Sequence, residues 1–444
     1  MLFTQEKLFL NSIKYDILVF MRMNLLPVNN ISHMADSSSS SFGLILSGGG
    51  ARAAYQVGVL SEILSILKSA GVPRSGLFQV ICGTSAGAIN AAALACGADD
   101  PDQAVQDLVQ VWSDFSCEQV YESDVLSMLG SSARWMSLLS LGWLLSQKRL
   151  RPRYLLNNEP LLGLLKDRID FSRLPKLLAS GHLKALGIGA FSYGRSEHVT
   201  FYESAQALLP WVRNQRLAQS CRFTHEHLLA SAAIPFIFPA VPLLSDWGPA
   251  YFGDGSMRQT APISPAIHLG ADRILVIAAG RMVEPKSEAV VNPAYPSMAN
   301  IAGQALSSIF LDAMAVDVER LRRVNQTLQL IPAEQRSQAR LRPIELLLIA
   351  PSQRLDSLAA KHAHEVPLTV RGLLRTMGAK PGQQMGQAGA LLSYLLFEAP
   401  FTRALIALGR QDAQAQSAEI LQFFQAATGL EQPATLQEPV QSLV

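Results

Sequence analysis

The segment LFQVICGTSAGAINAAALA, at residues 77–95, indicates the fold class of the chain. Its first six residues are apolar except for Gln79, which is typical of a buried β-strand. The pentapeptide Gly83-Thr84-Ser85-Ala86-Gly87 then makes a sharp turn, and the small residues after it predict a helix that packs closely on a sheet. Because a strand, a turn and a helix in this order form one unit of an α/β protein, we expect a parallel sheet with helices on both faces.

The same pattern occurs earlier in the chain and continues later. The apolar run Phe42–Leu46 is followed by three glycines, and apolar side chains then recur every four residues from Tyr55 to Leu67, which predicts an amphipathic helix ending near Gly71. Further apolar runs predict three strands, at 184–190, 273–279 and 344–350, and two long helices, at 298–330 and 384–398. The predicted fold is a three-layer α/β/α domain with a mainly parallel central sheet.

Composition divides the chain into three parts. We expect residues 1–41 to be a disordered leader that ends in a serine run, with Met34 as an alternative start of translation. Residues 42–410 form the main domain, with a helical insertion at about 100–180 that is rich in Leu, Trp and Met. Residues 411–444 are rich in Gln and Ala, and we expect a helix and a frayed tail there.

Charge and composition exclude several classes of function. Of the 444 residues, 49% are hydrophobic and 16% are charged, so most of the chain can bury a core. The net charge of +2 gives no basic excess for a nucleic acid, and we expect no such partner. The four cysteines lack CxxC spacing, which argues against a zinc ribbon and a disulfide-stapled secreted domain. We therefore expect a cytoplasmic location, no metal and no cofactor.

No transmembrane helix is expected, because the longest apolar stretches fall well short of about 18 residues. The helical insertion leaves two interpretations open. Its apolar stretch at 135–145 and the basic cluster at 148–153 could form a lid that rests peripherally on anionic lipid headgroups. Equally, the stretch could pack as an ordinary helical subdomain whose basic residues are solvated.

Ser85 is the candidate nucleophile. A serine in a G-x-S-x-G turn between a strand and a helix projects its hydroxyl from the carboxyl edge of the sheet. Gly83 and Gly87 are needed because a Cβ at either position would collide with neighbouring backbone. The pentapeptide alone is weak evidence, but its position between a strand and a helix favours the catalytic interpretation over a chance match.

Gly48, Gly49 and Gly50 form a second candidate element. Successive glycines before a helix can turn their backbone N–H groups toward one point, which makes a site for an anion. That anion could be a nucleotide phosphate or the oxyanion of an acyl-transfer intermediate. No Lys-Ser/Thr pair follows the glycines, and Arg52 interrupts the spacing of a dinucleotide loop. The oxyanion interpretation is favoured, with a purely structural turn as the alternative.

A serine nucleophile needs a base, and a histidine is the usual one. The sequence has eight histidines, and four of them have settings that favour a surface or capping role: His182, His225, His227 and His268. Asp254 is a different candidate, since it lies between Gly253 and Gly255, where backbones can pack tightly around its carboxylate. Desolvation there would raise its pKa and its basicity. A D-G pair by itself is more typical of a turn.

Taken together, these elements resemble the patatin-like phospholipase family. That family has a G-G-G-x-R-G loop, a G-x-S-x-G elbow and a D-G-[GA] motif in the order found here, at 47–52, 83–87 and 254–256. The segments at 230–239 and 262–272 resemble the stretches on either side of the family's catalytic acid. The resemblance covers roughly residues 42–350, and the stretch at 393–397 is similar to a late helix of bacterial members. Two positions depart from the pattern: Ala53 replaces a glycine, and Ser256 replaces Gly or Ala.

The resemblance implies a serine acyl hydrolase, a phospholipase A or lipid esterase, that uses a Ser-Asp dyad without a histidine. Ser85 would be the nucleophile and Asp254 its base. The amides of Gly48–Gly50 would form the oxyanion hole, and Arg52 would hold that loop or add positive charge. The implied substrate is a lipid or another fatty-acyl ester.

Three alternatives stay open at this point. One is a Ser-His-Asp esterase of the α/β-hydrolase type. Another is a module without catalytic activity that binds a nucleotide or another anion in the glycine loop. The third is a catalytically silent relative, which the changed residues Ala53 and Ser256 leave open.

Overall fold

The computed structural model describes residues 41–122, 154–282, 295, 297–332, 335, 341–368, 370–372 and 385–425. Four predicted segments lie outside these ranges: the leader up to residue 40, the apolar stretch at 135–145, the basic cluster at 148–153, and the tail after residue 425.

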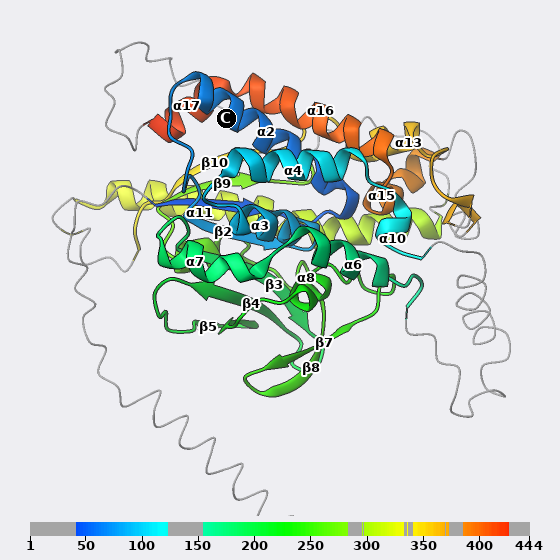
Figure 1. Cartoon of the computed structure of the whole chain (residues 1–444), viewed down its shortest axis with the longest axis horizontal. Helices are drawn as coiled ribbons and strands as arrows, with labels where there is room; N and C mark the ends of the chain where they lie inside the picture. Colours follow the sequence, from blue (N-terminus) through cyan, green and yellow to red (C-terminus); the bar gives the residue numbers. More distant parts are fainter. Residues whose placement is uncertain are drawn as a thin grey trace, which may run out of the picture. The chain divides into compact units, whose positions relative to one another are not determined.

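A ten-stranded sheet forms the centre of the fold (Figure 1). Its strands are β1 (Phe42–Leu46), β2 (Val80–Thr84), β3 (Ala185–Ser192), β4 (Glu197–Ser204), β5 (Val212–Arg213), β6 (Arg216–Ser220), β7 (Val241–Ser245), β8 (Gly248–Asp254), β9 (Arg273–Ile277) and β10 (Glu345–Ile349). The strand order is β10-β9-β1-β2-β3-β4-β6-β5, and β8 pairs with both β3 and β7.

The half of the sheet from β10 to β3 is entirely parallel. Its five strands are those predicted from apolar runs, although β2 begins at Val80, three residues later than the run itself. The other half is largely antiparallel, since β4 and β8 both run against β3, and β7 runs against β8. The strands between residues 197 and 254 were not predicted.

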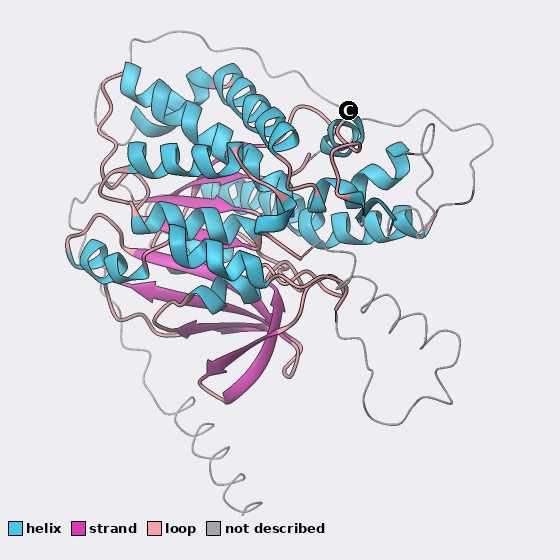
Figure 2. Cartoon of the chain, turned by 45° about the vertical axis from the view of Figure 1, so that its right-hand side comes forward, coloured by secondary structure: helices cyan, strands magenta, loops and turns pink. Residues whose placement is uncertain are grey.

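Helices cover both faces of the sheet (Figure 2). The α-helices are α2 (Ala54–Ser69), α3 (Ala86–Cys96), α4 (Pro101–Ser113), α6 (Glu159–Arg168), α7 (Leu174–Ala179), α8 (His225–Ser231), α9 (Ser264–His268), α10 (Met298–Ser307), α11 (Ala313–Leu330), α13 (Leu355–Lys361), α15 (Met385–Leu395), α16 (Ala399–Ala415) and α17 (Ser417–Gln425). Shorter helical turns are η1 (Gly50–Ala53), η2 (Cys117–Gln119), η3 (Phe171–Arg173) and the π-helical η4 (Ser308–Asp312).

Strand β1 shows how the three layers arise. Successive side chains of a strand point to opposite faces. Leu44 and Leu46 belong to a large core with α2, α3, α4 and α16, whereas Ile45 belongs to a smaller core with α9 and α11. The predicted α/β/α arrangement with a mainly parallel centre is therefore confirmed.

The long helical segment α10–η4–α11 follows the prediction for residues 298–330, with one π-helical turn inside it. Within the described ranges, Asn300–Leu330 is long and apolar enough to cross a membrane by length and composition alone, as is the bent pair Gly389–Leu395 and Ala399–Ala415 if it counts as one span. By that criterion the expectation of no such stretch is wrong. Met314 and Val318 pack in the smaller core, but only 35% of the apolar window in this segment is buried.

Two glycines allow α2 and α16 to cross closely. A Cβ at Gly58 would lie 2.1 Å from the carbonyl oxygen of Ile406, and a Cβ at Gly409 would lie 2.3 Å from that of Tyr55. Because the atoms in the way belong to the backbone, a side chain at either position would force the helices apart.

We expect Gly58→Ala to lower the free energy of unfolding by about 1–3 kcal/mol, measured by urea denaturation, through this overpacking. Gly163→Ala is the matched control. Gly163 lies on the exposed face of α6 with no neighbouring atom within 4 Å of an added Cβ, so alanine should raise stability by about 1 kcal/mol through helix propensity. Similar effects for the two variants would contradict the close crossing.

Candidate active site

Ser85 lies in the turn between β2 and α3, as predicted. Its φ of 55° is in the left-handed region, which is strained for a residue with a side chain. The flanking glycines permit this turn: a Cβ at Gly83 would lie 2.5 Å from the Gly87 carbonyl oxygen, and a Cβ at Gly87 would lie 2.4 Å from that of Leu46. The strained backbone holds the hydroxyl at the carboxyl end of β2.

The Ser85 hydroxyl contacts the Asp254 carboxylate. Its Oγ donates a hydrogen bond to Oδ2 of Asp254 over 2.7 Å, and both residues are buried. The sheet brings them together, because Asp254 ends β8, β8 pairs with β3 at Ala190, and β3 lies next to β2. Two residues that are 169 positions apart in the chain thus meet at one edge of the sheet.

The environment of Asp254 makes its carboxylate more basic than usual. Burial raises its pKa from 3.8 to about 6, and hydrogen-bond donors on Ser85 and Ser256 partly offset that rise. One of these donors is the Ser256 amide, 2.9 Å from Oδ1. The carboxylate is therefore ionised at neutral pH and can accept a proton more readily than an exposed aspartate.

Ser231 connects the two halves of this arrangement, and it was not singled out from the sequence. Its hydroxyl accepts a hydrogen bond from the Ser85 amide over 2.9 Å and donates one to the Gly189 carbonyl over 2.6 Å. Its own carbonyl accepts from the Gly255 amide. The sequence signal that could have identified it is the single polar side chain in the otherwise apolar segment at 230–239, and in the structure this serine is fully buried.

The glycine loop lies beside Ser85. Gly50 and Ser85 line the same cavity, and Gly50 has a φ of 54°. Within the described ranges, the amides of Gly48, Gly49 and Gly50 donate to no protein acceptor. The loop therefore offers unused backbone donors next to the serine.

The histidines do not join this arrangement. Within the part of the chain that the structure describes, no histidine hydrogen-bonds to Ser85 or Asp254. The four histidines discussed above have other partners: His182 bonds Ser180, His225 bonds the Ile169 carbonyl, His227 caps α8 with Thr224, and His268 stacks on Trp211. His198 on β4 is buried, and burial lowers its pKa to about 4.

Comparison with known proteins gives the family. Residues 44–267, half of the chain, match the family model for patatin-like phospholipases. The chain belongs to the patatin-like phospholipase family. No curated protein matches it significantly.

Solved structures resemble this patatin-like phospholipase only remotely. VipD from Legionella pneumophila is 15% identical with a TM-score of 0.27, over 83% of this chain and 67% of VipD. ExoU from Pseudomonas aeruginosa, solved in complex with SpcU, is 17% identical with a TM-score of 0.24, over 80% of this chain and 77% of the other. The assignment therefore rests on the family match.

The two departures from the patatin-like pattern are accommodated by close packing. Ala53 is fully buried in η1, where its carbonyl accepts a hydrogen bond from the Asn90 side chain over 3.2 Å. Ser256 is buried beside the glycine loop, and a Cβ at Gly48 would lie 2.5 Å from its hydroxyl oxygen. Ala53 thus keeps η1 bonded to α3, and Ser256 lies in close contact with the glycine loop.

Arg52 is buried between the loop and helix α15. Its Nε donates to the Ser393 hydroxyl over 2.8 Å, and its guanidinium lies 4.0 Å above the ring of Tyr394. A Cβ at Gly50 would lie 2.3 Å from the Tyr394 carbonyl oxygen, so the loop and α15 are in close contact. Of the two roles implied for Arg52, these contacts favour holding the loop.

Proposed function

We propose that this patatin-like phospholipase hydrolyses lipid acyl esters with Ser85 as nucleophile and Asp254 as base. The hydrogen bond of 2.7 Å between Ser85 Oγ and Asp254 Oδ2 is the observation that carries the proposal. A base must lie within hydrogen-bond reach of the proton that it accepts, and here the carboxylate reaches the hydroxyl directly. The proposed substrate is a phospholipid or a related acyl ester, met at the surface of a membrane or micelle.

The proposed reaction has two halves. Asp254 accepts the proton of Ser85 as Oγ attacks the ester carbonyl carbon, and the amides of Gly48–Gly50 stabilise the negative oxygen of the tetrahedral intermediate. The carbon–oxygen bond to the alcohol then breaks, and Asp254 returns its proton to the leaving alkoxide. In the second half, water gives a proton to Asp254 as its oxygen attacks the acyl carbon. The bond from that carbon to Ser85 Oγ then breaks, Asp254 returns the proton to Oγ, and the fatty acid leaves.

The alternatives have less support. A Ser-His-Asp triad needs an imidazole within reach of Ser85, and in the described part of the chain no histidine hydrogen-bonds to Ser85 or Asp254. A phosphate-binding role for the glycine loop would leave the contact between Ser85 and Asp254 without a purpose. The short distance between these two side chains favours catalysis over anion binding.

A fluorophosphonate probe tests the proposal. We expect the wild-type protein to react with the probe at Ser85, located by tandem mass spectrometry, and to hydrolyse p-nitrophenyl esters with or without a chelator. Labelling at another residue would remove Ser85 from the mechanism. An unlabelled protein that is thermally stabilised by a nucleotide would favour the anion-binding alternative.

A further inference from the structure

The cavity beside Ser85 continues along helix α3. Its volume is about 620 Å³, which lies within the usual range for small-molecule sites. The α3 residues that line it include Ile89, Ala93 and Cys96, which lie on one side of the helix because they are spaced by three and four positions. Helix α3 has 11 residues, so the cavity follows it for about 16 Å from Ser85.

Helix α4 forms a second wall and runs back along α3. Asp100, the N-cap of α4, lies only four residues after the end of α3 at Cys96. Trp112, near its end, donates from Nε1 to the side-chain oxygen of Asn90 in the first half of α3, over 2.9 Å. The lining residues of α4 are therefore apolar toward Ser85, where Leu108, Val111 and Trp112 lie. Toward the far end they are Asp107, Ala104 and Gln103, two of which are polar.

Helix α6 forms a third wall with the same change of polarity. Its first two turns contribute Leu161, Leu164 and Leu165 to the cavity, and its last turn contributes Asp167 and Arg168. Just before α6, the Leu156 amide donates a hydrogen bond to the Ile237 carbonyl over 2.8 Å. The next residue, Phe238, lines the cavity, so the start of α6 lies at that part of it. Helices α4 and α6 thus present apolar side chains at one end of the cavity and charged ones at the other, whereas the lining of α3 is apolar along its length.

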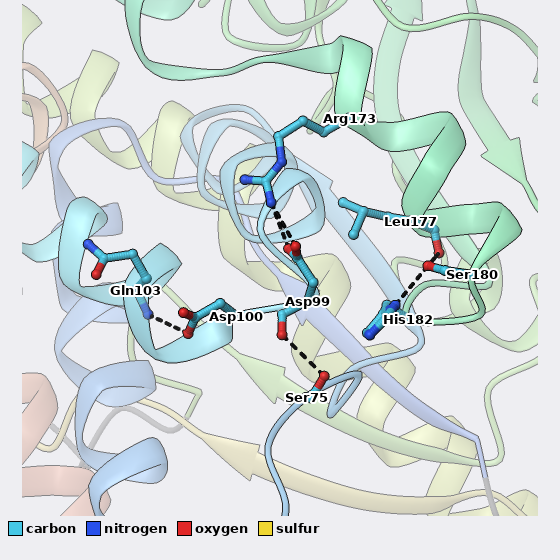
Figure 3. Close-up of polar contacts among 8 residues, drawn as sticks. All are labelled: Ser75, Asp99, Asp100, Gln103, Arg173, Leu177, Ser180 and His182. Carbon is cyan, nitrogen blue, oxygen red and sulfur yellow. Dashed lines mark hydrogen bonds and ion pairs between the residues drawn. The ribbon is translucent and has the colours of Figure 1, made fainter.

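An ion pair crosses the far end of the cavity (Figure 3). Nη2 of Arg173, on η3 after α6, lies 2.8 Å from each carboxylate oxygen of Asp99, in the loop between α3 and α4. Asp100 beside it accepts from the Gln103 amide over 3.1 Å. These groups already have partners and are partly solvated, so a methylene group that reached them would gain little from leaving water.

We propose that the acyl chain of the substrate lies along α3, and that the polar far end limits it to a medium length. An extended alkyl chain advances about 1.25 Å per carbon, given its C–C bonds of about 1.5 Å, so 16 Å accommodates about 12 carbons. The enzyme then prefers acyl esters of about 10–12 carbons over those of 16 or more. This inference rests on the proposed function of Ser85.

The test measures kcat/KM for p-nitrophenyl esters from C4 to C16. We expect kcat/KM to rise by up to about fourfold for each added methylene to about C12, and then to level off or fall. Ala93→Phe, about 12 Å along α3 from Ser85, should lower the ratio of kcat/KM for the C12 ester over the C4 ester at least tenfold. Ala104→Phe, on the facing wall, is a second variant in case the first does not fold.

Gln106→Phe is the matched control, because Gln106 is exposed on α4 and does not line the cavity. Its chain-length profile should equal that of the wild type. A profile that rises steadily to C16, or that neither cavity variant changes, overturns the inference while ester hydrolysis still supports the proposed function. Absence of both labelling and turnover of the C4 ester overturns the proposed function, and the inference with it.

A second set of variants extends the apolar lining of the cavity. The double variant Asp99→Leu/Arg173→Leu removes both partners of the ion pair, so that no charge is left unpaired, and should raise the ratio of kcat/KM for C16 over C12 about tenfold. The control is Asp102→Leu/Arg74→Leu, which removes a neighbouring ion pair of 2.8 Å outside the cavity. Equal ratios in the two double variants would show that the ion pair does not limit chain length.

Discussion

Replacing Asp254 by asparagine should abolish ester hydrolysis and, at the same time, stabilise the folded protein at pH 8. The loss in kcat should be at least about 10⁴-fold, because removal of the base of a serine nucleophile costs as much as removal of the nucleophile itself. An amide at this position can still accept a hydrogen bond from Ser85, but it cannot take up the proton. The variant therefore separates the binding geometry from the proton transfer.

The pH dependence of the wild-type enzyme follows from the same carboxylate. Burial raises the pKa of Asp254 to about 6, and only its ionised form can act as a base. We expect kcat/KM to fall tenfold per pH unit below about 6 and to be level from pH 7 to 8. A midpoint near pH 4 would mean that the carboxylate is solvated when the enzyme works.

Stability changes with pH in the opposite sense. Because the pKa of Asp254 is higher in the folded state than its ordinary value of 3.8, the folded protein holds the proton more tightly, and stability falls as pH rises from about 4 through 6. Above that range the buried charge costs about 3 kcal/mol. Asparagine removes this cost but can accept from only one of the donors on Ser85 and Ser256. The donor left unpaired costs about 1–3 kcal/mol, so the net gain at pH 8 should be at most about 2 kcal/mol.

Urea denaturation of the wild type and of Asp254→Asn at pH 5 and pH 8 measures this effect. The difference between the two proteins should be larger at pH 8 than at pH 5, where part of the wild-type carboxylate is protonated. A variant that is inactive and also less stable at pH 8 would show that hydrogen bonds to the carboxylate outweigh its desolvation.

The parallel half of the sheet was predictable because a strand that is buried on both faces is apolar throughout. Strand β1, with Leu44, Ile45 and Leu46 in sequence, is an example. The antiparallel half was missed for a related reason. In β7, Val241 and Leu243 are buried whereas Pro242 and Leu244 are exposed, yet all four are apolar, so the alternation typical of a half-exposed strand is absent.

The site was predictable only in part. Ser85 and Asp254 stand in short motifs, and each motif limits the backbone around it, so they could be named from the sequence. The contacts that fix them depend on the tertiary fold. Ser231 reaches the Ser85 amide from 146 positions away, and Ser393 reaches Arg52 from 341 positions away. No local pattern encodes such pairings, nor the cavity that three separate helices enclose.

Ser85→Ala and Ser85→Gly should both lose probe labelling and at least about 10⁴-fold in ester turnover, because no other hydroxyl takes the place of the nucleophile. Their stabilities should differ. Each variant removes the hydroxyl that donates to the buried Asp254 carboxylate, which costs about 1–3 kcal/mol. Glycine also relieves the strain of a φ of 55°, whereas alanine keeps it, so Ser85→Gly should be the more stable by about 1 kcal/mol.

Ser196 provides a control that measures the relief of backbone strain alone. It has the same φ of 55°, but it is exposed and distant in sequence from the motifs of the site, so Ser196→Gly should show the relief of strain without the lost hydrogen bond and with full activity. Thermal and urea unfolding of the three variants separates the relief of backbone strain from the loss of the hydrogen bond to Asp254. Residual turnover by Ser85→Ala near the wild-type rate would exclude the serine mechanism, whereas equal stability of the alanine and glycine variants would mean that the turn at Ser85 stores no strain.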